Sequence, residues 1–92
     1  MFGGSYILEK LVFDNKRLGC AIRTTRQSAG MNQTDLAKAS GMDQSNVSKM
    51  ESGQHTPTLE ILARIAIGLR PDSPMEVISV LITAAFRREN IG

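Results

Sequence analysis

The segment spanning residues 33–53, QTDLAKASGMDQSNVSKMESG, restricts what this chain can fold into more than any other stretch. Leu36 and Ala37 in its first half, and Val47 and Met50 in its second half, recur at the spacing of one helical face. Two short helices with apolar faces at these positions can pack against each other at an angle. The segment therefore predicts a helical elbow with these four residues on its inside.

The same segment also predicts the turn of the elbow and the character of its outer side. Gly41 stands where the chain must leave the first helix sharply, in a conformation that is costly for a residue with a Cβ. Because the apolar residues of the second helix point inward, its opposite side carries the polar residues Gln44, Ser45, Ser48 and Lys49, with Asn46 at the edge. A protruding helix with such hydrogen-bonding side chains fits the major groove of B-DNA.

Length and charge place few other limits on the chain. Ninety-two residues suit one compact domain with a modest core. A net charge of +2 and a pI near 9.0 favour nucleic-acid binding only mildly, although Lys16, Arg17, Arg23 and Arg26 form a basic run without acidic residues. The chain has no apolar run of about 18 residues and its beginning, MFGGSYILEK, does not look like a secretion signal. We therefore expect a cytoplasmic protein with no membrane partner.

The residue types needed for catalysis or metal binding are scarce. The chain has one cysteine, Cys20, and one histidine, His55. Cys20 has no second cysteine for a disulfide, and neither residue has companions for a metal cage or a nucleophile–base pair. Asp14, Asp35 and Asp43 stand at expected helix starts, where they act as capping groups. We predict that the protein is not an enzyme and uses no cofactor and no metal.

The helix signals predict an all-α fold of about five helices. Predicted helices start near Asp14 or Asn15, after Asn32, after Asp43, at Thr58 and at Ser73, and the first four end at Gly30, Gly41, about Ser52 or Gly53, and Ile67. Residues 6–13 have the pattern of either a short helix or a strand. The chain thus divides into an N-terminal extension (1–13), a helical domain (14–70) and a C-terminal helix (71–92).

The C-terminal helix is unusually apolar. Between Met75 and Phe86 its strongly polar residues, Glu76, Ser79 and Thr83, lie on one narrow stripe. A small monomer cannot easily bury the remaining circumference, which favours packing against a second copy. The residues expected at this dimer interface are Val77, Ile78, Leu81, Ile82 and Ala85. In the alternative arrangement, the helix lies between the N-terminal segment and the elbow of its own chain.

The stretch LGCAIRTTRQSAGMNQTDLAKASGMDQSNVSKMESGQHTPTLEILARIA resembles the Cro/C1-type (XRE-like) helix-turn-helix DNA-binding proteins of bacteria and phages. The resemblance runs from Leu18 to about Leu69, more than half of the chain, and every spacing is kept from Arg26 through Pro57. It implies a lambda-repressor-like bundle. The implied function is sequence-specific transcriptional regulation, most simply by a dimeric repressor that inserts its third helix into the major groove.

The resemblance also implies individual roles. Gln33 would contact a phosphate and brace Gln44, which would read a base edge. The full set of implied DNA contacts is Asn32, Gln33, Gln44, Ser45, Asn46, Ser48, Lys49 and Ser52, with the loop 54–56 holding the backbone beyond the site. Arg26 and Glu51 match a pair that joins the first helix to the end of the third, as a partly buried ion pair that orients them. The loop carries no Lys or Arg, which departs from many relatives.

The implied partners are double-stranded DNA with a twofold-symmetric operator and a second copy of the chain. An alternative function is that of an antitoxin, which binds a cognate toxin protein and autoregulates its operon. A third reading is a protein-interaction adaptor that has lost DNA binding, although the polar residues of the third helix argue against it.

Overall fold

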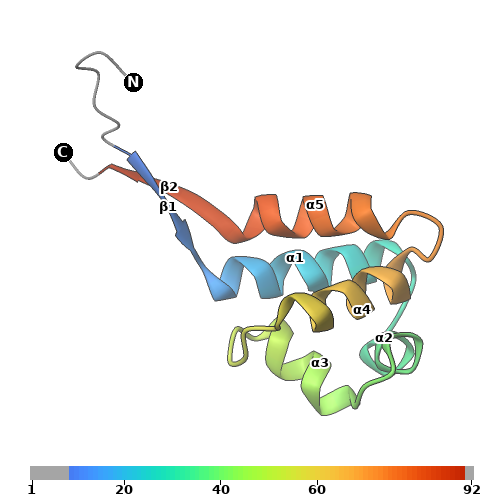
Figure 1. Cartoon of the computed structure of the whole chain (residues 1–92). Coiled ribbons are helices and arrows are strands. Elements are labelled where there is room, and N and C mark those ends of the chain that lie inside the picture. The colour runs from blue at the N-terminus through green and yellow to red at the C-terminus, as the bar shows by residue number, and fades with distance from the viewer. Residues whose placement is uncertain (1–8, 91–92) are drawn as a thin grey trace.

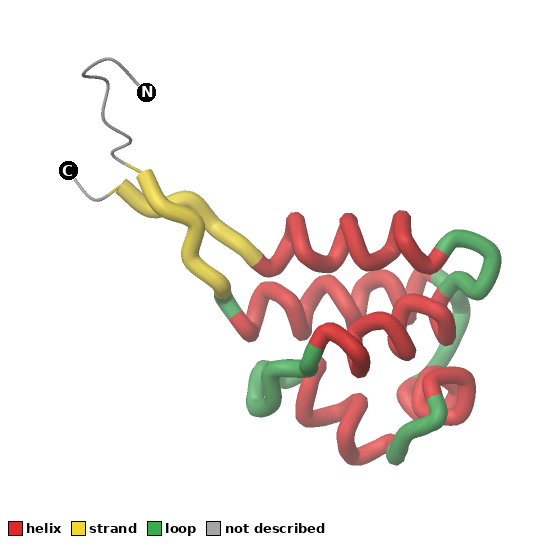
Figure 2. The backbone as a smooth tube through the Cα atoms, in the orientation of Figure 1, coloured by secondary structure: helices red, strands yellow, loops and turns green. Residues whose placement is uncertain are grey.

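The computed structural model describes residues 9–90 as a helical body from which a two-stranded β-ribbon extends (Figure 1, Figure 2). In chain order the elements are β1 (Glu9–Phe13), α1 (Asn15–Ser28), α2 (Gln33–Ser40), α3 (Gln44–Glu51), α4 (Leu59–Leu69), α5 (Pro74–Ala85) and β2 (Phe86–Asn90). The two ends of the described range form the ribbon, and the five helices form the body. The predicted all-α bundle is confirmed within the described residues, with a minor sheet added to it.

Local capping explains why the helices begin where they do. The side chain of Asp14 caps α1 and that of Thr58 caps α4, each accepting backbone N–H groups of the first turn. Asn32 and Asp35 form a reciprocal capping box at the start of α2. Asp43 precedes α3 as predicted, but its side chain makes no capping hydrogen bond. The predicted helix starts are therefore confirmed to within a residue.

Two glycines terminate helices in the way the sequence predicts. Gly41 follows α2 with a φ of 68°, and Gly30 follows α1 with a φ of 73°. In this left-handed region glycine has no Cβ penalty, so the chain can turn directly into the next helix. α1 itself ends two residues before Gly30, at Ser28, and α4 continues two residues beyond its predicted end, to Leu69.

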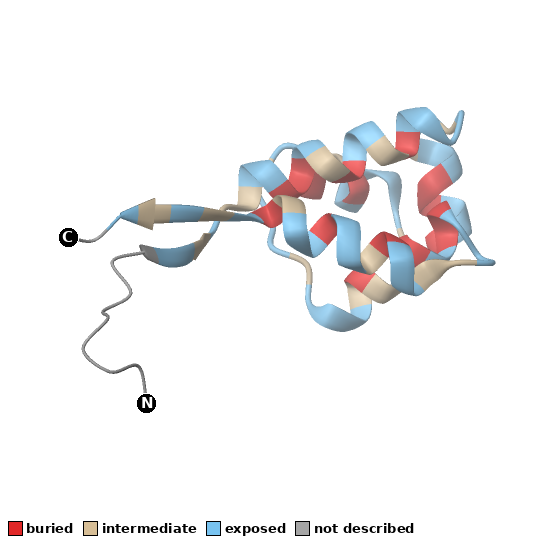
Figure 3. Ribbon diagram, turned by 90° about the horizontal axis from the view of Figure 1, so that it is seen from above, coloured by how far each residue is buried: buried red, intermediate tan, exposed pale blue. Residues whose placement is uncertain are grey.

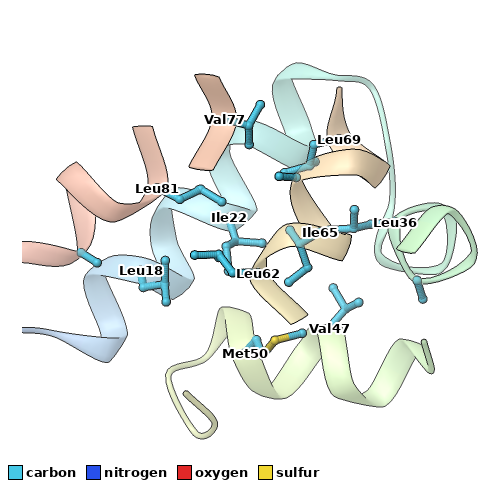
Figure 4. Close-up of a cluster of buried hydrophobic side chains, with 13 residues drawn as sticks. Leu18, Ile22, Leu36, Val47, Met50, Leu62, Ile65, Leu69, Val77 and Leu81 are labelled. Atoms are coloured by element: carbon cyan, nitrogen blue, oxygen red, sulfur yellow. The ribbon is translucent and has the colours of Figure 1, made fainter. Parts of the chain in front are cut away.

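All five helices contribute to one apolar core (Figure 4). Its largest fully buried side chains are Ile22, Leu36, Val47, Ile65 and Leu81, which come from α1, α2, α3, α4 and α5 respectively. Figure 3 shows the buried residues on the inward faces of the helices and exposed residues outside. The core confirms the predicted inward orientation of Leu36, Ala37, Val47 and Met50.

Helices α1 and α3 approach each other closely at Gly19. A Cβ at this position would lie 2.5 Å from the backbone carbonyl oxygens of both Met50 and Glu51. No side chain fits in that space, since real Cβ atoms do not come so near to backbone oxygens. The absence of a side chain at residue 19 thus allows the C-terminal end of α3 to rest directly on α1.

The prediction that residues 71–92 form a single helix is wrong for its last part. α5 ends at Ala85, and β2 pairs antiparallel with β1 in the register Val12 to Arg87. The prediction for residues 6–13 left helix and strand open; residues 9–13 form the strand, and residues 6–8 lie outside the described residues. Phe13 and Phe86 pack edge to face with ring centroids 5.5 Å apart, which stabilises the base of the ribbon.

The expected dimer interface on α5 also needs correction. Val77, Leu81 and Ala85 are at most 4% exposed, because α5 packs this face against α1 and α4 of its own chain. These three side chains belong to the core of their own chain, so they are not exposed to a second copy. The alternative arrangement is not seen either, because α5 lies on α1 and α4 and not between the N-terminal segment and the elbow. Of the five expected interface residues, only Ile78, which is half-buried, and Ile82, which is 37% exposed, remain available to a second copy.

The described range, residues 9–90, contains neither a membrane-spanning helix nor a cluster of metal ligands. None of its helices combines the length and apolar character needed to cross a membrane. Within the same range, no three His, Cys, Asp or Glu residues gather in a way that could hold a metal ion.

Candidate nucleic-acid interface

The outer side of α3 carries the predicted DNA-contacting residues and is open to solvent. Gln44, Ser45, Asn46 and Lys49 are exposed, and Ser48 is half-buried. Val47 and Met50 anchor the opposite side of the same helix in the core. The structure therefore brings these five polar residues together on one accessible face, in the arrangement that the sequence predicts.

Gln33 and Gln44, the first residues of α2 and α3, are joined by their side chains. Gln44 Nε2 donates to Gln33 Oε1 at 2.6 Å. This contact confirms that Gln33 braces Gln44. It restricts a long, exposed side chain before any ligand is present, and thereby lowers the entropy that Gln44 would lose on contacting a base.

A buried ion pair lies next to the two glutamines. Arg26 Nε and Nη2 donate to the two Glu51 carboxylate oxygens at 2.6 and 2.9 Å, and Arg26 Nη1 donates to the Met31 carbonyl oxygen at 2.9 Å. The hydrogen bond to Glu51 raises the pKa of Arg26 above its ordinary value. Arg26 is 8% exposed and Glu51 is 3% exposed, so the predicted pair exists and is buried rather than partly buried. It ties α1, the loop before α2 and the end of α3 together.

The sequence did not predict two further contacts of Glu51. Gln33 Nε2 donates to Glu51 Oε1 at 3.1 Å, which joins the ion pair to the glutamine pair. Arg23 Nε lies 3.7 Å from the same oxygen, with half of its side chain exposed. Arg23 and Arg26 both lie in α1, and their i, i+3 spacing was a signal that both face α3.

The loop after α3 rests on the beginning of α1. Asn15 Nδ2 donates to the Gly53 carbonyl oxygen at 2.9 Å, and a Cβ on Gly53 would lie 2.8 Å from Lys16 Cγ. Asp14 takes the capping role, which leaves the Asn15 side chain for this contact. Sequence reasoning missed it, because either residue could serve as the cap. The contact holds the loop at the edge of the exposed face.

Asn32 and Ser52, at the two ends of the predicted site, differ in which hydrogen-bonding groups remain free to contact DNA. Asn32 is exposed, and its side-chain oxygen is occupied by the capping bond to Asp35. Ser52 is exposed as well, but its hydroxyl donates to the Lys49 carbonyl oxygen at 3.0 Å. The Ser52 hydroxyl proton is therefore already engaged in the free protein, which makes Ser52 the weakest candidate of the set.

Two short helices joined by a glycine turn, with the second presenting a polar face to solvent, define a helix-turn-helix protein. The helix-turn-helix family model matches residues 22–70 of this chain. The chain belongs to the Cro/C1-type (XRE-like) helix-turn-helix family, a class of DNA-binding regulators rather than of enzymes.

Three relatives show the family in sequence and in structure. The ImmF control region 10 kDa protein of Bacillus phage phi105 is 38% identical over 61 residues, which is 66% of this chain and 68% of the relative. The restriction-modification controller protein C.AhdI from Aeromonas hydrophila superposes with a TM-score of 0.61 and 32% identity, covering 67% of this chain and 92% of that one. The structure of C.Esp1396I bound to a 25 base pair operator site superposes with a TM-score of 0.68 and 29% identity. The match covers 79% of this chain and 95% of that one.

Proposed function

We propose that the protein is a sequence-specific repressor that binds a twofold-symmetric operator as a dimer. The observation that carries this proposal is the hydrogen bond between Gln33 and Gln44, which holds a base-reading side chain ready on the exposed face of α3. An amide presented in this way pairs most naturally with adenine in the major groove. Ser45, Ser48 and Lys49 extend the same face along the helix.

The relatives support the regulatory part of the proposal. The phage phi105 protein is a control region protein, and C.Esp1396I was solved both on a 25 base pair operator site and as a tetramer on its natural 35 base-pair operator. Occupation of a promoter by the two copies would block transcription. Cations of α1, with the backbone N–H groups at helix starts, would supply salt-dependent contacts to phosphates.

For the dimer, we propose the apolar patch at the end of the body that carries the ribbon. The patch consists of four apolar residues around a surface hollow between α4, α5 and the ribbon, namely Phe13, Leu59, Ile82 and Phe86. We add Ile78, which stands one helical turn before Ile82 on α5. Leu59 is 79% exposed, and Phe13, Ile82 and Phe86 are each about two-fifths exposed. To contact two half-sites, a dimer formed through this patch must place its two α3 helices about 34 Å apart, one turn of DNA.

Selection of bound sites from a random pool of duplex DNA tests the function. We expect a consensus with twofold symmetry, and a consensus without it would contradict a symmetric dimer. In gel shifts on the selected site, Gln44→Ala and Lys49→Ala should each weaken binding by about tenfold. Arg70→Ala is the matched control, because Arg70 is an exposed cation at the end of α4 beside α5, away from α3. Unchanged affinity in both α3 variants would remove the assignment of this face.

A further inference from the structure

We infer that the Glu51 carboxylate decides which atoms of the Gln44 amide face the DNA, and so sets the base preference of α3 without contacting a base. This inference rests on the proposed function, since it assumes that Gln44 reads a base edge. It concerns Glu51 as a positioning residue, a role distinct from holding α1 and α3 together.

The Glu51 carboxylate accepts hydrogen bonds from two side chains. Its Oε1 accepts from Arg26 Nη2 at 2.9 Å and from Gln33 Nε2 at 3.1 Å, while Oε2 accepts from Arg26 Nε at 2.6 Å. A carboxylate paired with a guanidinium carries no proton and can only accept hydrogen bonds. Gln33 must therefore turn its NH₂ group toward Glu51 and its carbonyl oxygen toward Gln44.

The orientation of the Gln33 amide determines that of the Gln44 amide. Because Gln33 presents an oxygen, Gln44 must donate its Nε2 group, and the distance of 2.6 Å is that of a short hydrogen bond. Gln44 is then left with one free N–H and its carbonyl oxygen. This donor–acceptor pair matches N7 and the N6 amino group of adenine.

The reverse orientation of the two amides would suit a different base. If both amides were flipped, Gln44 would accept from Gln33 and would direct its two N–H groups outward. Two donors match the two acceptors of guanine, N7 and O6. The acceptor-only character of Glu51 thus favours adenine over guanine at the position that Gln44 reads.

Burial of the ion pair stabilises the hydrogen bond between Gln33 and Glu51. Glu51 is 3% exposed and Arg26 is 8% exposed, so little solvent reaches the carboxylate to exchange for the Gln33 amide. Arg26 is in turn held by the Met31 carbonyl oxygen at 2.9 Å. The starting point of the chain of hydrogen bonds is therefore held in place, while its far end, Gln44, is exposed.

The test compares the sequences selected from a random duplex pool by the wild-type protein, Glu51→Gln and Gln44→Ala. A glutamine at residue 51 can turn its NH₂ group toward Gln33 and reverse both amides. We expect the wild type to select adenine at one position in each half-site, and folded Glu51→Gln to lower the adenine-to-guanine ratio there by about tenfold, a factor typical of one good bidentate contact. Gln44→Ala should lose the preference at the same position, which identifies it.

Retained adenine preference in folded Glu51→Gln, at the position that Gln44→Ala abolishes, would overturn the inference and leave the proposed function standing. A wild-type protein that selects no sequence would overturn both. Because Glu51→Gln can unfold the protein, a second measurement uses the wild type alone. In NMR spectra, the Gln33 side-chain NH₂ should exchange with water more slowly than that of exposed Gln54. Equal exchange rates would contradict the proposed contact with Glu51.

Discussion

Arg26 and Glu51 are separated by 25 positions in the sequence, and their side chains meet through two hydrogen bonds of 2.6 and 2.9 Å. Glu51 is the last residue of α3, so this pair determines how the end of that helix sits on α1. Glu51 also accepts a hydrogen bond from Gln33, which in turn accepts one from Gln44. One buried carboxylate thus connects the packing of the bundle to the exposed face of α3.

Removing one member of this pair should destabilise the fold strongly. Glu51→Ala leaves the buried Arg26 guanidinium without its partner, and we expect a loss of about 3–5 kcal/mol in the free energy of unfolding. The double variant Arg26→Met/Glu51→Leu replaces the pair with apolar side chains and should lose much less. Urea unfolding followed by circular dichroism measures both. A double variant as unstable as Glu51→Ala would mean that the loss does not come from an uncompensated charge.

Substituting Gly19 in α1 should displace the C-terminal end of α3, which packs against it. A Cβ here would lie 2.5 Å from the Met50 and Glu51 carbonyl oxygens, so Gly19→Ala must separate the two helices. We expect a net destabilisation of about 1–3 kcal/mol, although alanine is the better helix former. Binding to the selected DNA should weaken as well, because the end of α3 moves. Thr24→Ala, at an exposed position of α1, is the control, and equal stability of the two variants would disprove the close contact.

The two faces of α5 should respond differently to charge. Ile82→Arg places a cation in the proposed dimer patch at a side chain that is 37% exposed, and we expect a folded monomer in analytical ultracentrifugation. Leu81→Arg places the cation in the core, where Leu81 is 0% exposed, and should unfold the chain instead. Val80→Arg, on another exposed side of α5, controls for added charge. Dimers that persist in Ile82→Arg would place the interface elsewhere.

The β-ribbon should loosen in acid. A hydrogen bond of 2.6 Å from Arg87, together with its charge, holds the pKa of Glu89 below its ordinary value. A carboxyl group whose pKa is lowered by folding stabilises the folded form above the ordinary carboxyl pKa, about 4.3, and loses this contribution as the pH falls through the lowered value. The effect should be small, because the group is exposed.

Hydrogen exchange of the ribbon amides, measured from neutral pH down to acid against amides of α1 as internal reference, checks this prediction. The protection of the amides of residues 10–13, relative to those of α1, should decrease once the pH is lower than the ordinary carboxyl pKa. Glu89→Gln should remove most of that pH dependence. A ribbon with the same relative protection at both ends of the range would rule out a contribution from Glu89.

What the sequence by itself determined is local or periodic. Asn32 with Asp35, and Gly41, sit within one turn of the helix ends that they define, so their roles follow from spacing alone. The inward set of Leu36, Ala37, Val47 and Met50 follows from helical periodicity. The polar face of α3 follows in turn, because a helix with its apolar side buried must present the other side to solvent.

The tertiary structure alone decided the features that depend on which distant segments meet. Residues 86–90 form a strand because β1 is there to pair with them, and β-pairing is a non-local choice that a helical pattern cannot reveal. The inner face of α5 is part of the core because α1 and α4 cover Val77, Leu81 and Ala85. The apolar composition of the helix indicated only that some surface must cover it, without saying which. The contact between Gln33 and Glu51 likewise depends on the angle between α2 and α3, which packing sets and sequence spacing does not.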